Sequence, residues 1–186
     1  MLRNFLLLPI LITTCAAAST RPMPIRCGMI PSDVYTCMGT PKIVQPGVSI
    51  KCDKSVTQCD RITCLFRESG WLSGDKLDKK KLTEHFEQFK REFPEWSAAV
   101  DNLKESCINS ELPPQGVYIN CPAYDIMFCS LSSFIKLAPV NKWSSEASCT
   151  YARQYAAACP VCPNDCFAPL VPIGSCNSCS LLPRSP

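Results

Sequence analysis

The chain between residues 76 and 93 alternates apolar and charged side chains with the period of a helix. Its apolar residues recur at i, i+4, i+7 and i+11, and most of the charged residues fall on the opposite side. These apolar residues are Leu82, Phe86, Phe89 and Phe93. The spacing predicts an amphipathic helix over Lys76–Phe93 that stops at Pro94, because proline lacks the N–H that a helix interior needs.

Four further segments predict helices. They are Lys54–Ser69, a segment beginning at Pro94, Cys121–Leu137 and Ser144–Ala158. The first ends at Gly70, and the last opens with a capping serine and an acidic residue in its first turn. The inward residues of the middle two are Trp96, Val100, Leu103 and Cys107, then Tyr124, Met127, Phe128, Leu131, Phe134 and Ile135. No alternating run long enough for a buried strand occurs in the sequence, so the pattern predicts an all-α protein.

The two ends of the chain differ from this helical middle. Thr20–Cys52 is rich in proline and shows no helical period, which predicts a loop-rich arm. After Cys159 the prolines exclude long helices. We therefore expect a compact bundle of about six helices around an apolar cavity. We expect a signal peptide at 1–18, a helical domain at 19–158 and a cystine-stapled extension of that domain at 159–186.

The N-terminus predicts secretion. An arginine precedes the short apolar run Phe5–Thr14, and the small residues of Cys15–Ser19 fit a signal-peptidase site with cleavage after Ala18. The run is too short to span a bilayer, which needs about 20 apolar residues. The alternative is that Cys15 carries a lipid anchor, but Thr14 before it and the even number of remaining cysteines favour cleavage.

Cysteine is the most unusual component of the sequence. Of 15 cysteines, 14 remain after the signal peptide, which predicts seven disulfides and no free thiol. Two C-x-x-C pairs, Cys159/Cys162 and Cys176/Cys179, have nearly the spacing of a zinc site. Cys166 between them and the oxidising compartment favour disulfides, so we expect no metal. Neither pair begins a helix after a strand, as a thioredoxin-like redox site would.

Catalytic chemistry has little support in the sequence. His85 is the one histidine of the chain, lies in the middle of a predicted helix, and has no nucleophile motif beside it. We expect neither enzymatic activity nor a cofactor, and leave open a role of His85 in pH sensing. The formal charge of +3 falls to +2 without Arg3, which implies neither a nucleic acid nor a membrane surface as partner.

The aromatic stripes have two interpretations. They either fill the core or line a ligand cavity, since both are built from the same residue types. The candidate cavity residues are Leu82, Phe86, Phe89, Phe93, Trp96, Val100, Tyr124, Met127, Phe128, Leu131, Phe134 and Tyr155. The hydroxyls of Tyr124, Tyr151 and Tyr155 are candidate hydrogen-bonding groups, and Leu170–Ile173 and Leu181–Leu182 are candidate covers of the cavity mouth.

Several blocks together resemble insect odorant-binding proteins. The stretch Cys59–Leu72 looks like the second and third cysteines of that family with the turn that follows, and Cys107 lies where its fourth would lie. The blocks Phe134–Trp143 and Cys149–Cys159 are similar to the Plus-C subgroup, which has extra cysteines and a long C-terminal region. Four residues separate Cys59 from Cys64, where the family usually has three.

The resemblance implies a disulfide pattern. In the family, the first cysteine pairs with the third, the second with the fifth, and the fourth with the sixth. Ala138-Pro139 stands where the family has Cys-Pro, and eight residues separate Ala138 from Cys129 before it. The resemblance therefore implies that Cys37 or Cys27 pairs with Cys64 and that Cys59 pairs with Cys129. We hypothesise that Cys107 pairs with Cys121 instead of the missing cysteine.

The resemblance also implies a function. We expect a secreted carrier that binds small hydrophobic molecules such as odorants or pheromones and dissolves them in extracellular fluid, without membrane insertion. Any contact with a membrane receptor would be indirect, and a homodimer stays open. The alternative is a secreted cystine-rich interaction or inhibitor-like protein that acts through its C-terminal region.

Overall fold

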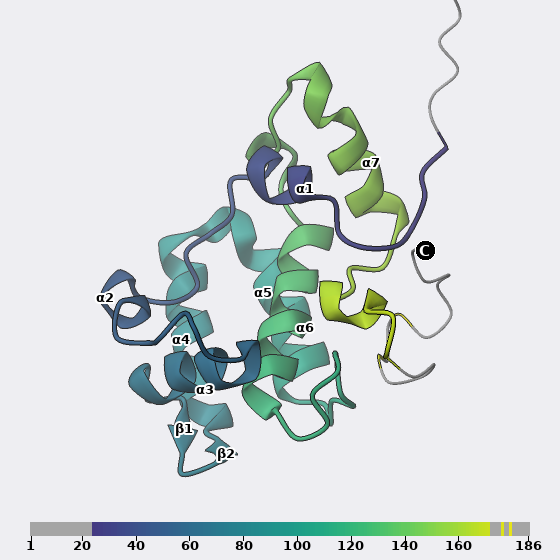
Figure 1. The fold of residues 1–186 in the computed structure, drawn as a ribbon. Coiled ribbons are helices and arrows are strands. Elements are labelled where there is room, and N and C mark those ends of the chain that lie inside the picture. The colour runs from purple at the N-terminus through teal and green to yellow at the C-terminus, as the bar shows by residue number, and fades with distance from the viewer. Residues whose placement is uncertain (1–23, 172–175, 177–178, 180–186) are drawn as a thin grey trace, which may run out of the picture.

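The computed structural model describes residues 24–171, 176 and 179, and within them the protein is mostly helical, as expected (Figure 1). The expected signal peptide, the segment Leu181–Leu182 and part of Leu170–Ile173 lie outside the described residues. The α-helices are α1 (Ser32–Cys37), α2 (Pro46–Ser49), α3 (Gln58–Glu68), α4 (Lys79–Glu92), α5 (Ser97–Leu103), α6 (Pro122–Lys136) and α7 (Thr150–Ala158). Shorter helical turns are η1 (Pro94–Trp96), η2 (Lys104–Ile108), η3 (Val140–Lys142), η4 (Ala147–Cys149) and η5 (Asn164–Phe167).

Capping side chains set where the helices begin. The hydroxyl of Thr57 accepts a hydrogen bond from the Asp60 N–H at 3.2 Å, and α3 therefore begins after Thr57 and not at Lys54. The Asp78 carboxylate accepts one from the Lys81 N–H at 3.0 Å and starts α4. The expected beginnings of both helices were too early. The expected α6 is confirmed to within one residue at each end.

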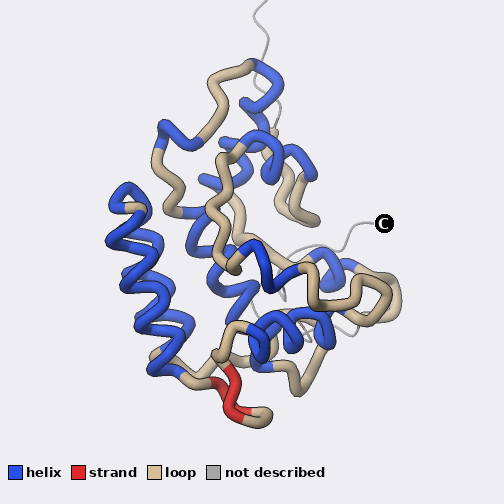
Figure 2. The backbone as a smooth tube through the Cα atoms, turned by 90° about the vertical axis from the view of Figure 1, so that its left-hand side faces the viewer, coloured by secondary structure: helices blue, strands red, loops and turns tan. Residues whose placement is uncertain are grey.

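A short hairpin and two short helices were not expected. Strands β1 (Leu72–Ser73) and β2 (Lys76–Leu77) pair antiparallel, and Gly74 between them has a positive φ of 62°, which suits glycine (Figure 2). Helices α1 and α2 lie in the arm that was expected to be loop. Elements of two to six residues are too short to show a hydrophobic period, which is why the sequence pattern missed them.

The aromatic stripe forms the centre of the core. Phe134 of α6 contacts Trp96, Phe89 and Phe86, with ring centroids 5.4, 5.6 and 6.5 Å apart. All four side chains are buried. The rings therefore pack against one another and form a buried aromatic cluster.

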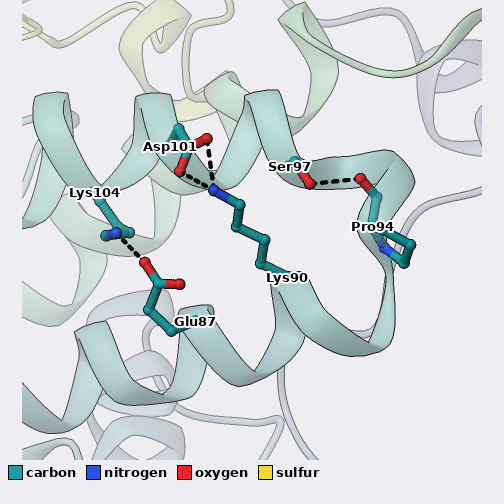
Figure 3. A network of polar contacts seen from close by, with 6 residues as sticks. All are labelled: Glu87, Lys90, Pro94, Ser97, Asp101 and Lys104. Carbon is teal, nitrogen blue, oxygen red and sulfur yellow. Dashed lines mark hydrogen bonds and ion pairs between the residues drawn. The ribbon is translucent and has the colours of Figure 1, made fainter.

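Ion pairs join the exposed face of α4 to α5 and to η2, which follows α5 directly. The Lys90 ammonium donates to both Asp101 oxygens, at 2.6 and 2.8 Å, and Lys104 pairs with Glu87 (Figure 3). The hydrogen bond from Lys104 lowers the pKa of Glu87. Because these pairs are partly exposed to water, each contributes about 1 kcal/mol or less to stability.

The N-terminal arm is fixed on α7. Disulfides join Cys27 to Cys159 and Cys37 to Cys149, and α1 lies beside α7 (Figure 1). Between these bridges, the Tyr155 hydroxyl donates to the Gly28 carbonyl at 2.7 Å. The arm and α7 are therefore held together as one layer by two disulfides and this hydrogen bond.

The structure contains the seven disulfides that the cysteine count predicts, but none of the three expected pairings. The pairs are Cys27–Cys159, Cys37–Cys149, Cys52–Cys64, Cys59–Cys121, Cys107–Cys129, Cys162–Cys179 and Cys166–Cys176. The expected pairs Cys37–Cys64, Cys59–Cys129 and Cys107–Cys121 were wrong because Cys52 was passed over as the first cysteine of the series and Cys129 was taken as the fifth instead of the sixth. Cys27 and Cys37 pair with the cysteines that flank α7, so the series starts at Cys52.

The six cysteines that follow the arm have an interlocked order of pairing. They are Cys52, Cys59, Cys64, Cys107, Cys121 and Cys129. In this series the first pairs with the third, the second with the fifth and the fourth with the sixth. Six cysteines can pair in 15 ways, so this order is a specific feature of the fold.

Cystines also account for the two C-x-x-C motifs. Cys159 and Cys162 have partners in different parts of the chain, and Cys179 pairs with Cys162. The described residues contain no cluster that could hold a metal ion.

Seven disulfides are typical of proteins that fold in an oxidising, extracellular environment. No helix among the described residues is long and apolar enough to cross a membrane.

Candidate functional site

A half-open groove of about 700 Å³ lies beside the hairpin, between α3 and the beginning of α6. Its apolar walls come from Leu72, Leu77, Leu112, Ile119, Ala123 and Ile126, and its polar residues include Thr63, Asp75, Lys79, Glu111 and Asp125. We call it the hairpin groove. The volume lies within the roughly 300–1,000 Å³ range of small-molecule sites.

Two disulfides fix the elements around the hairpin groove. Cys59–Cys121 joins α3 to the residue before α6, and Cys107–Cys129 joins η2 to the middle of α6. Cys107 and Cys121 themselves line the groove. Leu72 and Leu77, which also line the groove, are partners across the hairpin. Disulfides therefore connect the elements of the groove that belong to α3, η2 and α6, and backbone pairing holds the hairpin.

Asp125 is the buried charged residue of the groove. It is 7% exposed, and its Oδ1 accepts a hydrogen bond from the Gln115 N–H at 2.7 Å. Burial raises the pKa of Asp125, and the bond from Gln115 opposes that shift only in part. Its other oxygen, Oδ2, has no hydrogen-bond partner among the residues that the structure describes.

The loop before α6 is fixed by a second carboxylate. The Tyr124 hydroxyl donates to both Asp165 oxygens at 2.8 Å, and burial beside Asp165 raises the pKa of Tyr124. Gly116 lies against this pair, and a Cβ there would come within 2.6 Å of the Tyr124 ring. Only glycine fits at this position. The hydrogen bonds between Tyr124 and Asp165 hold the C-terminal extension against the loop that forms one wall of the groove.

The twelve residues predicted as cavity candidates do not line the hairpin groove. The buried ones are Leu82, Phe86, Phe89, Trp96, Val100, Tyr124, Phe134 and Tyr155, and the half-buried ones are Met127, Phe128 and Leu131. Phe93 is 42% exposed because it follows the last residue of α4, where the helical register ends.

The predicted tyrosine hydroxyls already have partners in the protein. Tyr124 donates to Asp165, Tyr155 to the Gly28 carbonyl and Tyr151 to the Arg26 carbonyl. Burial raises the pKa of Tyr155 to about 12. These groups hold segments of the chain together, and they do not face the groove.

The groove residues were missed because most lie outside long periodic segments. Leu72 and Leu77 belong to the short hairpin, and Leu112 and Ile119 to the loop before α6. One signal was readable in the sequence. Asp125 is the one acidic residue between Pro122 and Lys136, in an otherwise largely apolar helix.

His85 lies at a separate cavity of about 190 Å³ between α4 and the arm. Its Nε2 donates to the Ile43 carbonyl at 2.9 Å, and its ring packs on Trp71 with centroids 4.6 Å apart. Burial lowers the pKa of His85 below its ordinary value of 6.5, and the Ile43 carbonyl and Glu92 oppose this shift. The folded protein therefore favours the neutral imidazole.

This environment predicts that acid weakens the fold through His85. Since the pKa is lower in the folded state, the unfolded chain binds the proton first as the pH falls below 6.5. Stability should then decrease until the pH reaches the lower, folded value. We expect His85→Gln, whose amide can still donate to Ile43, to have a flatter stability profile between pH 7.5 and pH 5 in urea unfolding. Parallel profiles for the variant and the parent would contradict this prediction, because all other titrating groups are common to both.

No protein-family model matches the chain, and a search of curated proteins finds no significantly similar sequence. The function is therefore argued from the groove, the disulfides and the helical fold.

Proposed function

We propose that this protein is a secreted carrier of small hydrophobic molecules and that the hairpin groove is its binding site. The observation that carries the proposal is the groove itself, whose volume and mixture of apolar walls with few polar groups suit a small ligand. Transfer of apolar ligand surface from water into the groove would supply about 25 cal/mol per Å². An affinity near micromolar, about −8 kcal/mol, is expected for a drug-sized ligand.

The disulfides support the carrier role in two ways. Their number favours an extracellular protein, in agreement with the expected signal peptide. In addition, the order of pairing from Cys52 to Cys129 is the order that the resemblance to insect odorant-binding proteins implies, although it involves other cysteines than those first expected. We therefore retain the Plus-C subgroup as the proposed relationship.

Filling the groove tests the proposal. Leu112 is half-buried, lines the groove and lies in a loop, so tryptophan at this position would occupy ligand space without disturbing a helix. We expect Leu112→Trp to weaken uptake of the neutral fluorescent probe N-phenyl-1-naphthylamine at least about tenfold, or about 1.4 kcal/mol.

The matched control is Val140→Trp in η3, which is 89% exposed and lies outside the groove. It should bind the probe like the parent protein. If the parent protein takes up no probe, or if the two variants bind it equally well, the hairpin groove is not a site for hydrophobic ligands.

A further inference from the structure

The hairpin groove is lined by the carboxylate of Asp125, one of whose oxygens accepts no hydrogen bond from the described residues. Asp125 is more than nine-tenths buried and lines the groove, but the Gln115 N–H occupies only its Oδ1. A ligand that brings a donor to Oδ2 would give this oxygen a hydrogen bond. An entirely apolar ligand would instead exclude water from Oδ2 and leave it without a partner.

The charges around the groove determine which donor is favoured. Asp75, Glu111 and Asp125 line the groove against one cation, Lys79. In the part of the chain that the structure describes, none of these four residues forms an ion pair. The excess of negative charge attracts cations and repels carboxylates and phosphates.

We propose that the hairpin groove selects small apolar molecules that carry a protonated amine, with the Asp125 carboxylate binding the ammonium group. This inference rests on the proposed function and adds the chemical class of the ligand. The apolar body lies against Leu72, Leu77 and Ile126, which line the same groove. An ammonium-carboxylate hydrogen bond is about twice as strong as a bond between neutral groups, so the amine is preferred over an alcohol of the same shape.

Two matched ligands test the selectivity. 2-Phenylethylamine, which is protonated at pH 7, and 2-phenylethanol differ only in the polar group, and each is titrated against bound N-phenyl-1-naphthylamine. We expect the parent protein to bind the amine about tenfold more tightly than the alcohol.

The Asp125→Asn variant should bind the two ligands within about twofold of each other, with the alcohol affinity unchanged. Its amide oxygen can still accept the Gln115 N–H, so a fold like that of the parent is expected and is checked by the thermal midpoint. The control Glu111→Gln removes an exposed carboxylate of the groove and should retain most of the preference for the amine.

The outcomes separate this inference from the proposed function. Equal binding of amine and alcohol by the parent protein, or an unchanged preference in Asp125→Asn, would overturn the inference while the groove remains a hydrophobic site. Failure of the parent to take up the probe would instead remove the proposed function, and the inference with it. The comparison in the parent protein needs no variant, so the inference is testable even if Asp125→Asn does not fold.

Discussion

Removing both disulfides between the N-terminal arm and α7 is expected to lower the free energy of unfolding by about 7 kcal/mol. Nine residues separate Cys27 from Cys37, and nine separate Cys149 from Cys159, so either bridge closes a loop of about 20 residues while the other is intact. Loss of one bridge should therefore cost about 3 kcal/mol. Once one bridge is gone, the remaining bridge closes a far longer loop. For Cys37–Cys149 this loop is 112 residues along the chain, and the other disulfides inside it shorten it. Loss of this second bridge should therefore cost about 4 kcal/mol more.

Alanine replacement of each pair, and of both pairs together, allows urea unfolding to measure these values. A typical domain is stable by about 5–15 kcal/mol, so the double removal should leave the arm and α7 near or beyond unfolding. Removal of Cys52–Cys64, which are 12 residues apart, is the control for a single short loop and should cost about 3 kcal/mol. A double removal that costs no more than one single removal would contradict the prediction. It would show that the contacts of Tyr155 and the arm hold this layer without the bridges.

The long helices were predictable because each buries one periodic face. The stripe from Leu82 to Phe89 needs a partner, and Phe134 on α6 provides it, so both helices follow from apolar spacing alone. The first residues of α3 and α4 were predicted less well, because Thr57 and Asp78 each act through a single capping hydrogen bond that leaves no periodic signal. Phe93 has the correct spacing and is still exposed, because spacing places a side chain only while the helix continues.

The disulfide pairs were not predictable, although their number was. A count fixes how many bridges form, whereas pairing depends on which segments the fold brings within reach. Cys37 was assigned to the first place, but the arm pairs with the cysteines beside α7 and not with α3, so Cys52 takes that place. Cys59, Cys64 and Cys107 were assigned correctly to the second, third and fourth places. Cys121 and Cys129 fill the fifth and sixth, so no cysteine of the six is missing.

The hairpin groove was not predictable for a related reason. Most of its lining lies within residues 110–126, a loop and the first turns of a helix, and the rest comes from the hairpin and neighbouring helices. The loop has no hydrophobic period that would show which of its side chains face a groove. We expected the ligand to bind among the long aromatic stripes because these stripes are the strongest apolar pattern in the sequence. Strong periodicity favours close packing, however, and a site for a ligand is formed where packing is incomplete.

Replacing Phe134 by alanine should distinguish these two roles of the aromatic stripe. Phe134 is fully buried and contacts three aromatic rings, so its loss removes transferred area and leaves a cavity, which together cost about 3–5 kcal/mol. Phe93→Ala is the matched control, since that ring is 42% exposed and touches Phe89 at one side, and it should cost about 1 kcal/mol or less. Both values are measured by urea unfolding, with probe uptake measured on the folded fraction. If Phe134 lined a ligand site, Phe134→Ala would change probe affinity while the stability stayed close to that of Phe93→Ala. A large loss of stability with unchanged affinity in the folded fraction is the result expected here, because Phe134 fills the core and the proposed ligand site lies beside the hairpin.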